Sequence, residues 1–511
     1  MDMRRKLLGK EHAQTLSSME NIAVIYSNQE KWNEAEQLQV KVMDMRKKLL
    51  GEEHPDTLRS MVNLAHIYGS QKRWNEAEQL EVQVMDMRKK LLGEEHPDTF
   101  SSMSDLVQIY EHQARWNEAE QLEVQVMDMR KKLLGEEHPE TLRSMINLAF
   151  IYWKQGRQDK AEQLEVQVME MRKKLLGEEH AQTLSSMQSL AIIYSDQGRW
   201  NEAEQLQVKV MDMRKKLLDE EHPDTLRSMV NLAHIYGNRE RWNKAEQLEI
   251  QVIDMRKKLL GEEHSDTFAS MNDLAHTYKH QERWNEAEQL EVQVMDMRKK
   301  LLGEKHPGTL ESMINLAFTY SQQGRWVKAE QLEVQVMDLR KKLLGEEHPD
   351  TLESMECLVI TYFIQERWDR AEQLELQVMD IKKKLLGEEH PDTLRSMVNL
   401  AHIYGNQERW NEAEQLEVQF MDMRKKLLGE EHPDTLSSMN NLAHTYRHQK
   451  RWNEAEQLQV QVIEMKKKLL HKEHPDTLQS MECLAIAYFM QGMWDKAEQL
   501  EVHGHEEETA W

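Results

Sequence analysis

The chain has 511 residues, of which 31% are charged and 39% are hydrophobic, with only 9 Pro and 19 Gly. The low Pro and Gly content excludes a loop-rich all-β protein and a Pro/Gly-rich disordered protein, and the dominance of strong helix formers predicts an all-α fold. The net charge of −24 disfavours binding to nucleic acids and to anionic membranes, because both carry negative charge. No apolar stretch reaches the length needed to span a bilayer, and two cysteines are too few for a disulfide framework. We therefore expect a cytoplasmic protein.

The first residues already belong to a repeating pattern. The sequence Met-Asp-Met-Arg at 1–4 recurs at 43–46, in the middle of a predicted helix. We therefore expect residues 1–9 to be part of the second helix of a preceding repeat. Because stacked repeats normally end in polar capping units and neither end has one, the sequence favours a fragment of a longer protein.

Residues 10–502 consist of about twelve tandem copies of a 42-residue unit. Trp recurs at this spacing from Trp32 to Trp494, with Gln158 in place of one Trp, and all twelve Tyr follow the same spacing. A period of about 20 to 50 residues indicates stacked units rather than separate globular domains. Blocks of four units recur as well, because the segment 59–69 reappears at 227–237 and 395–405, every 168 residues.

Each unit has the pattern of a helical hairpin. Apolar residues from Pro55 to about Gln71 follow the spacing of one helical face, and a second stripe runs from about Arg73 to Leu92. Pro55 suits the first turn of a helix, and Gly93 is typical of a helix C-terminus. A hairpin of this size cannot bury both of its faces, so the units must stack on one another.

Residues 503–511 leave this pattern and form a polar tail that contains His503, His505 and a run of Glu. The composition predicts disorder more strongly than a metal-binding tail.

Several positions of the unit resemble the tetratricopeptide repeat (TPR), because Leu64, Ala65, Tyr68 and Ala77 fit its pattern. The 42-residue length and the His-Pro loop resemble the kinesin-light-chain type of this repeat, and the near-identical copies look most like the C-terminal arrays of fungal NLR-like proteins, which carry an NB-ARC or STAND signalling NTPase. The resemblance implies a right-handed superhelical solenoid of about twelve hairpins whose first helices line a concave groove. One departure is Glu81, where the family often has an aromatic residue. A second is the lack of a heptad segment, which argues against a true kinesin light chain.

Comparison of the twelve copies separates invariant stripe positions from variable positions on the first helix. Under the resemblance, the variable positions face the groove, and their variation points to recognition of a ligand; drift on a solvated face would produce the same variation. The basic candidates hint weakly at an acidic ligand. The candidate polar contacts are Arg59, His66, Arg227, His234, Arg395 and His402, and the candidate apolar anchors are Phe150, Trp153 and Phe318.

One groove position varies less than the others. An Asn amide offers both a donor and an acceptor, so a row of Asn can pair with the main chain of an extended peptide. The resemblance implies this role, since kinesin-light-chain-like arrays use Asn at this position in that way. The alternative is a hydrogen bond between adjacent helices, and the sequence leaves both open. The residues are Asn21, Asn63, Asn147, Asn231, Asn315, Asn399 and Asn441.

Other polar patterns give weaker signals. Two His pairs, 276/280 and 444/448, are spaced by one helical turn, but no third metal ligand is evident. The repeated Arg-Lys-Lys run complements the helix dipole at the end of the second helix, which predicts a solvated role. The sequence lacks the common catalytic and nucleotide-binding motifs. We therefore expect no enzymatic activity, no metal and no cofactor.

These patterns favour a non-enzymatic scaffold whose concave groove binds a peptide segment or a protein partner. Two alternatives stay open: a ligand-sensing region of a larger signalling NTPase, and a structural spacer with an empty groove. Near-identical units also allow self-association, because any unit can stack on any other.

Overall fold

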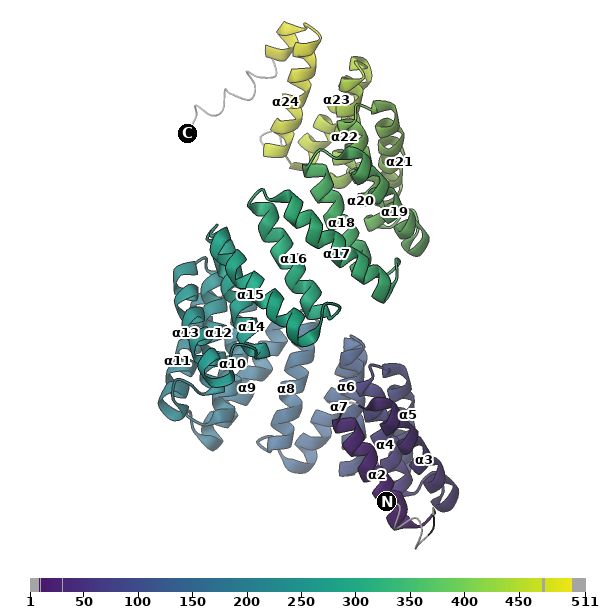
Figure 1. Cartoon of the computed structure of the whole chain (residues 1–511), viewed down its shortest axis with the longest axis vertical. Coiled ribbons are helices and arrows are strands. Elements are labelled where there is room, and N and C mark those ends of the chain that lie inside the picture. Colours follow the sequence, from purple (N-terminus) through teal and green to yellow (C-terminus); the bar gives the residue numbers. More distant parts are fainter. Residues whose placement is uncertain (1–8, 10, 30, 471–473, 499–511) are drawn as a thin grey trace. The chain divides into compact units, whose positions relative to one another are not determined.

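A computed structural model of the chain describes residues 9, 11–29, 31–470 and 474–498. Every regular element in this part of the chain is a helix (Figure 1), which confirms the predicted all-α class and the tandem hairpins. Most of the predicted segment 1–9 and all of the predicted tail 503–511 lie outside the described residues. The chain divides into two compact units, Met1–Met255 and Arg256–Trp511, and each is described by itself.

The first helix of each hairpin is 16 residues long. These helices are α2 (Ala13–Asn28), α4 (Pro55–Ser70), α6 (Pro97–His112), α8 (Pro139–Lys154), α10 (Ala181–Asp196), α12 (Pro223–Asn238), α14 (Ser265–His280), α16 (Pro307–Gln322), α18 (Pro349–Ile364), α20 (Pro391–Asn406), α22 (Pro433–His448) and α24 (Pro475–Met490).

The second helix of each hairpin is 19 residues long. These helices are α3 (Trp32–Leu50), α5 (Trp74–Leu92), α7 (Trp116–Leu134), α9 (Gln158–Leu176), α11 (Trp200–Leu218), α13 (Trp242–Leu260), α15 (Trp284–Leu302), α17 (Trp326–Leu344), α19 (Trp368–Leu386), α21 (Trp410–Leu428) and α23 (Trp452–Leu470). None of the described helices combines the length and the apolar character that a membrane crossing requires.

The loop between hairpins fixes the start of each first helix. The His54 Nδ1 atom accepts a hydrogen bond from the Asp56 N–H at 3.1 Å, so it caps the helix whose first residue is Pro55. The Thr57 hydroxyl donates to the Gly51 carbonyl at 2.8 Å and ties the loop down. Gly51 has a φ of 93°, a left-handed conformation that favours glycine. The loop His residues are thus structural.

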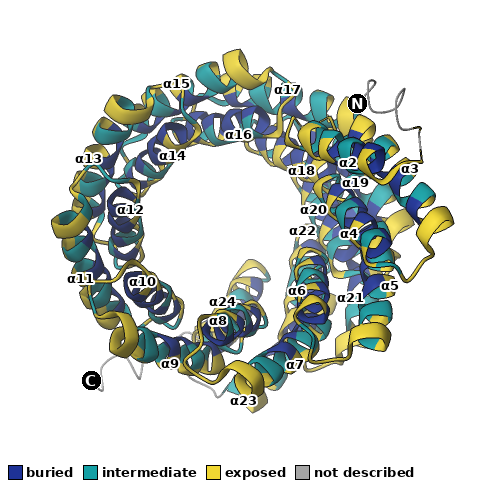
Figure 2. Cartoon of the chain, turned by 90° about the horizontal axis from the view of Figure 1, so that it is seen from below, coloured by how far each residue is buried: buried dark blue, intermediate teal, exposed yellow. Residues whose placement is uncertain are grey.

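Small residues let the two helices of a hairpin approach closely. Ala65 and Ala77 are buried where α4 meets α5, and Met61 and Val84 pack between the same helices. Within each unit the even-numbered helices form one layer and the odd-numbered helices the other, and the even-numbered layer lies on the concave side (Figure 2). The exposed surface of the even-numbered helices is therefore where a groove ligand would lie.

A cation that is buried or half-buried joins each described second helix to the next hairpin. The Arg46 guanidinium donates to the Asp56 carbonyl at 3.1 Å and to the Ser60 hydroxyl at 2.7 Å, and Arg46 is only 2% exposed. Arg88 repeats both contacts one hairpin later. The predicted solvated role of the Arg-Lys-Lys run is therefore wrong for its first residue, whereas Lys47 and Lys48 are exposed as expected.

A second link crosses the same interface nearer the turn. The Arg73 guanidinium donates to the Glu36 carboxylate of the preceding hairpin at 2.9 Å and lies over the Tyr68 ring with 4.2 Å to the centroid. The ion pair and the cation–π contact share one guanidinium, so the invariant Tyr and the Arg of the turn act together.

The departure from the family pattern at Glu81 places a carboxyl group inside the stacking interface. Where a repeat has Gln at this position, the amide nitrogen has a partner: Gln39 Nε2 donates to the Ser60 carbonyl at 3.0 Å, while Gln39 Oε1 has no hydrogen bond from the described residues. Where it has Glu, as at Glu81 and Glu123, the side chain is fully buried, and neither carboxyl oxygen has a well-aligned hydrogen bond from the described residues. A carboxylate cannot donate to a carbonyl, but a protonated carboxyl group can.

Burial changes the protonation of these groups. Loss of hydration raises the pKa of Glu81 to about 7, reinforced by the charge of Asp105 and opposed by His66, Ser102 and Arg88. Loss of hydration likewise raises the pKa of Glu123 to about 7 against the opposing effects of Ser144 and Arg130. Glu165 and Glu417 behave in the same way.

We predict that the array loses stability as the pH rises from about 4.5 to 7, because the unfolded chain ionises these carboxyl groups first while the folded chain keeps them protonated. Each such group contributes a loss of roughly 3 kcal/mol, from about 1.4 kcal/mol per pKa unit. Glu123→Gln should therefore raise the thermal midpoint at pH 8 and change it little at pH 5, as measured by circular dichroism.

The chain supplies the matched control. Gln207 holds the same position, and its amide donates to the Ser228 carbonyl at 2.9 Å. Gln207→Glu should lower the midpoint at pH 8 and leave it almost unchanged at pH 5. A midpoint that is independent of pH in both variants would show that these carboxyl groups do not titrate with folding.

Candidate functional site

One of the variable positions lies on the exposed face of the first helices. His66, Phe150, His234, Phe318 and His402 are all exposed. Their neighbours along the helix, such as the Leu and Ala of the stripe, are buried. The variation is therefore concentrated on the surface of the concave layer and not in the core.

The Asn row lies deeper than this surface and contacts neighbouring helices. Asn63 Nδ2 donates to the Glu20 carboxylate of the preceding first helix at 2.9 Å. Asn147 lies close enough to Glu123 to counteract part of the rise in its pKa, although the hydrogen bond is poorly aligned. At these sites the amide serves the contact between helices, which is the second of the two roles that the sequence left open. All members of the row are half-buried except Asn21, which is exposed; the others are Asn63, Asn147, Asn231, Asn315, Asn399 and Asn441.

The three candidate Arg residues are already paired. Arg59 donates to Asp56 one turn earlier at 2.8 Å and lies 3.7 Å from Glu20. Arg227 makes the same contact with Asp224 at 2.8 Å. Arg395 pairs with Asp392 at 3.0 Å and approaches Glu356 at 3.7 Å. Each of these positions therefore combines a guanidinium with a neighbouring carboxylate, so the three Arg residues alone do not favour an acidic ligand.

The candidate histidines have different electrostatic surroundings. The carboxylate of Asp105, whose Oδ2 lies 3.9 Å from Nε2, raises the pKa of His66, and the charge of Glu81 adds to this. Burial lowers the pKa of His402. In the more C-terminal His pair, the two Nε2 atoms of His444 and His448 lie 3.3 Å apart. The described residues contain no group of three or more side chains suited to hold a metal ion.

The aromatic candidates of the first unit form a cluster of their own. The Phe150 ring lies 5.8 Å from the Trp153 ring and meets Trp116 edge-on at 6.3 Å. Trp153 Nε1 donates to Asp196 Oδ2 at 2.6 Å, so the indole bridges α8 and α10. The Lys154 ammonium lies over the Trp153 ring at 4.4 Å. The indole thus spans the gap between the two first helices at this point.

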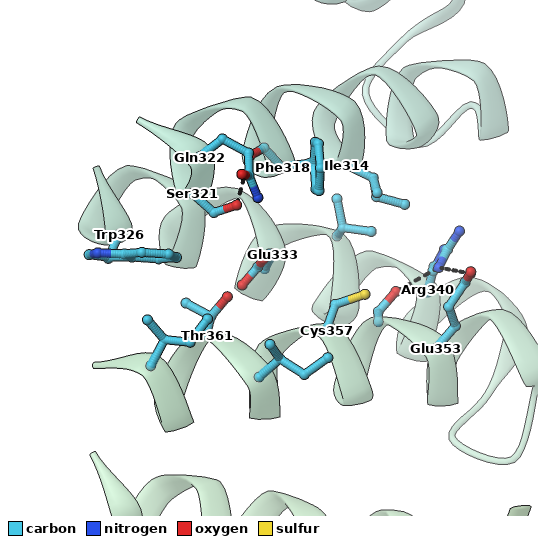
Figure 3. A pocket seen from close by; sticks show the side chains of 14 residues that line it. Ile314, Phe318, Ser321, Gln322, Trp326, Glu333, Arg340, Glu353, Cys357 and Thr361 are labelled. Atoms are coloured by element: carbon cyan, nitrogen blue, oxygen red, sulfur yellow. Dashed lines mark hydrogen bonds and ion pairs between the residues drawn. The ribbon is translucent and has the colours of Figure 1, made fainter. Parts of the chain in front are cut away.

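In the second unit, the space between α16 and α18 is open. A hollow of about 300 Å³ lies there, with Ile314 and Phe318 on one wall and Cys357 and Ile360 on the other. Figure 3 shows Phe318 and Cys357 facing one another across it, with Glu333 of α17 at its base. The lining is mainly apolar, so the hollow suits an apolar side chain.

A second hollow of about 450 Å³ lies on the other side of α18, against α20. It brings together three of the residues singled out from the sequence, Arg395, Asn399 and His402. Ile360 and Cys357 line both hollows. The two hollows therefore adjoin across the exposed surface of α18, where they share these lining residues.

Several polar groups of this site are shifted toward their neutral forms or are paired. Burial raises the pKa of Glu333, and the neighbouring Glu330 adds to the rise while Thr361 opposes it. Burial and three nearby carboxylates raise the pKa of the Cys357 thiol to about 11. Arg340 donates to Glu353 at 3.3 Å and to the Ser354 hydroxyl at 2.7 Å. Because the raised pKa disfavours the thiolate form of Cys357, the thiol is not an activated nucleophile, and these groups suit binding.

The sequence indicated only part of this site. It singled out Phe318, Arg395, Asn399 and His402, but it gave no reason to place Ile360 or Glu333 beside them. Ile360 occupies the same variable position as Phe318, so its variability was the available signal. The hollow itself was not foreseeable, because it depends on which side chains of two adjacent hairpins leave the space empty.

Comparisons with known proteins agree with this architecture. Two models of the tetratricopeptide repeat match the chain, together over more than half of its length, and this confirms the predicted repeat type. No curated protein sequence matches it. The first model matches residues 14–90, 98–174, 166–216, 181–258, 224–300 and 266–342, and the second matches 351–392, 393–434 and 435–476.

Solved structures include two similar arrays. The nearly identical TPR-like repeats assigned to a kinesin light chain of Podospora anserina are 34% identical over 41% of this chain and 99% of that chain, with a TM-score of 0.38. A STAND protein with a tetratricopeptide repeat sensor from Pyrococcus horikoshii is 14% identical over 76% of this chain and 55% of that chain, with a TM-score of 0.46.

We predict that Asn63→Ala destabilises the first unit by about 0.5–1.5 kcal/mol, because the change removes a hydrogen bond to a carboxylate between adjacent hairpins. The measurement is urea unfolding followed by circular dichroism. Asn28→Ala, at the exposed end of α2, is the control and should have almost no effect. If Asn63→Ala unfolds at the wild-type urea concentration, the amide does not stabilise the stacking.

Proposed function

Because the chain belongs to the tetratricopeptide repeat family, we propose that it is a non-enzymatic scaffold whose concave layer of first helices binds a peptide segment or a protein partner. The observation that carries this proposal is the pair of adjoining hollows on either side of α18. They lie on the layer where the copies differ most in sequence, while the residues of the stacking interface stay nearly constant.

The chemistry of the hollows supports binding of an apolar side chain together with the main chain next to it. Ile360 is 58% exposed and Phe318 is 50% exposed, so a ligand that covers them removes apolar surface from water. Asn399 lies in the second hollow, where its amide is placed to meet the polar main chain of a bound segment.

The test begins with selection of binding peptides from a random display library on the full chain. The selected peptides are then titrated against wild type and Ile360→Lys. Ile360 is exposed and lines both hollows, so a charge there should obstruct the site without unfolding the helix. We expect the affinity to fall by at least about tenfold, as for the loss of one buried apolar side chain.

The matched control is Ile192→Lys. Ile192 occupies the same position of the repeat in α10 and is 40% exposed, but it lines neither hollow. This variant should bind the peptides with wild-type affinity. Failure to select any peptide, or equal loss in both variants, would contradict the proposed function.

A further inference from the structure

The chain contains two versions of one interhelical space, 168 residues apart. Between α8 and α10, Trp153 bridges the two first helices by its hydrogen bond to Asp196. Between α16 and α18, the equivalent residues are Ser321 and Ile364, and both line the open hollow of about 300 Å³. We call the first version, which the protein's own aromatic side chain bridges, the closed version, and the second the open version.

Much of the surrounding wall is the same in both places. Ile314, Phe318 and Ile360 of the open version correspond to Ile146, Phe150 and Ile192 of the closed version. Other lining residues differ: Gln322, Trp326, Cys357 and Thr361 of the open version correspond to Lys154, Gln158, Ser189 and Ile193. Gln158 is the position at which the regular Trp of the repeat is missing. The first unit thus shows that this framework accommodates a bulky aromatic group between the first helices.

The open version has lost the polar partner of that aromatic group. Asp196, which accepts the indole N–H in the first unit, is replaced by the apolar Ile364. An incoming group therefore meets an apolar surface at this end of the hollow. A purely apolar side chain, such as that of Phe or Leu, matches this lining better than one with a polar tip.

Two exposed carboxylates form what we call the acidic rim: Glu353 lines the open hollow, and Glu311 lies one turn before the lining residue Ile314 on α16. Glu311 and Glu353 are each 67% exposed, whereas Arg298 and Arg340, which pair with them, are only 14% and 13% exposed. A ligand approaching from solvent therefore meets carboxylates before it meets guanidinium groups. The equivalent rim residues of the closed version are Arg143 and Ser185, so the acidic rim accompanies the open hollow.

We propose that the hollow between α16 and α18 binds a bulky apolar side chain of a peptide segment that carries basic residues on both sides of it. This inference rests on the proposed function and specifies the ligand of the same site. The apolar side chain takes the place that Trp153 fills in the first unit, and the basic residues lie against Glu311 and Glu353.

The test uses the full chain and four labelled nine-residue peptides, titrated by fluorescence anisotropy. Three of them have a central Phe with two Lys, two Gln or two Glu on each side, and the fourth has a central Ala between Lys pairs. The fourth peptide measures the attraction of a cationic peptide to the net charge of −24. We expect the Lys–Phe peptide to bind at least about tenfold more tightly than both the Glu–Phe peptide and the Lys–Ala peptide.

Two variants transfer the closed version into the second unit. Ser321→Trp, Trp326→Gln and Ile364→Asp, combined in one chain, recreate the residues at 153, 158 and 196, and should abolish binding that depends on Phe. Glu311→Arg with Glu353→Ser recreates the rim at 143 and 185, and should remove the preference for Lys over Glu. The residues introduced by each variant already occur at the equivalent positions of the first unit. Both variants should therefore keep wild-type helical content and melting temperature.

Each result decides the proposal. Equal binding of the Lys–Phe and Lys–Ala peptides, or wild-type binding by the filled-hollow variant, would overturn it. Binding that depends on Phe but not on the flanking charge would overturn the proposal that the ligand carries basic residues, and it would leave the proposed function intact. If the library-selected peptides also fail to respond to Ile360→Lys, the proposed function itself fails.

Discussion

The stacking of each hairpin on the next depends on one cation. The guanidinium of Arg46, almost fully buried, reaches the Asp56 carbonyl and the Ser60 hydroxyl of the following first helix. Lys466 makes the same two contacts, with Asp476 and Ser480 at 2.9 Å each, near the other end of the described chain. Because a buried cation needs partners in fixed positions, this contact sets how one hairpin lies against the next within each unit.

This repeated interface limits where the copies can differ. Residues that take part in it, such as the stripe Ala and the His of the loop, serve the same contact in every hairpin. The exposed positions of the first helices take no part in it, so they are free to change from copy to copy. Glu81 and its equivalents are an intermediate case, because a carboxyl group is tolerated in the interface at the expense of stability above neutral pH. Because the exposed positions change without affecting the interface, the same stacked hairpins carry an open hollow beside Ser321 in one place and the Trp153 bridge in another.

Much of the fold was predictable because its signals are local. The first helix of the hairpin was expected from Pro55 to about Gln71 and spans Pro55–Ser70, since Pro, the apolar stripe and the turn all act within a few residues. The buried role of Arg46 was not predictable, because it depends on the distance to the next hairpin. The candidate site was found in part. Variability pointed to Phe318 and His402, whereas the pairing of Arg59 with Asp56 and the open space beside Ile364 depend on side-chain positions that one sequence does not specify.

The central claim is that ligands bind between adjacent first helices, at positions where the copies differ. The most direct measurement is photo-crosslinking of a library-selected peptide that carries a benzophenone side chain, followed by mass spectrometry of the full chain. The account predicts crosslinks on the exposed faces of α16, α18 and α20, at residues such as Phe318, Ile360 and His402. Crosslinks concentrated on the odd-numbered helices would contradict it.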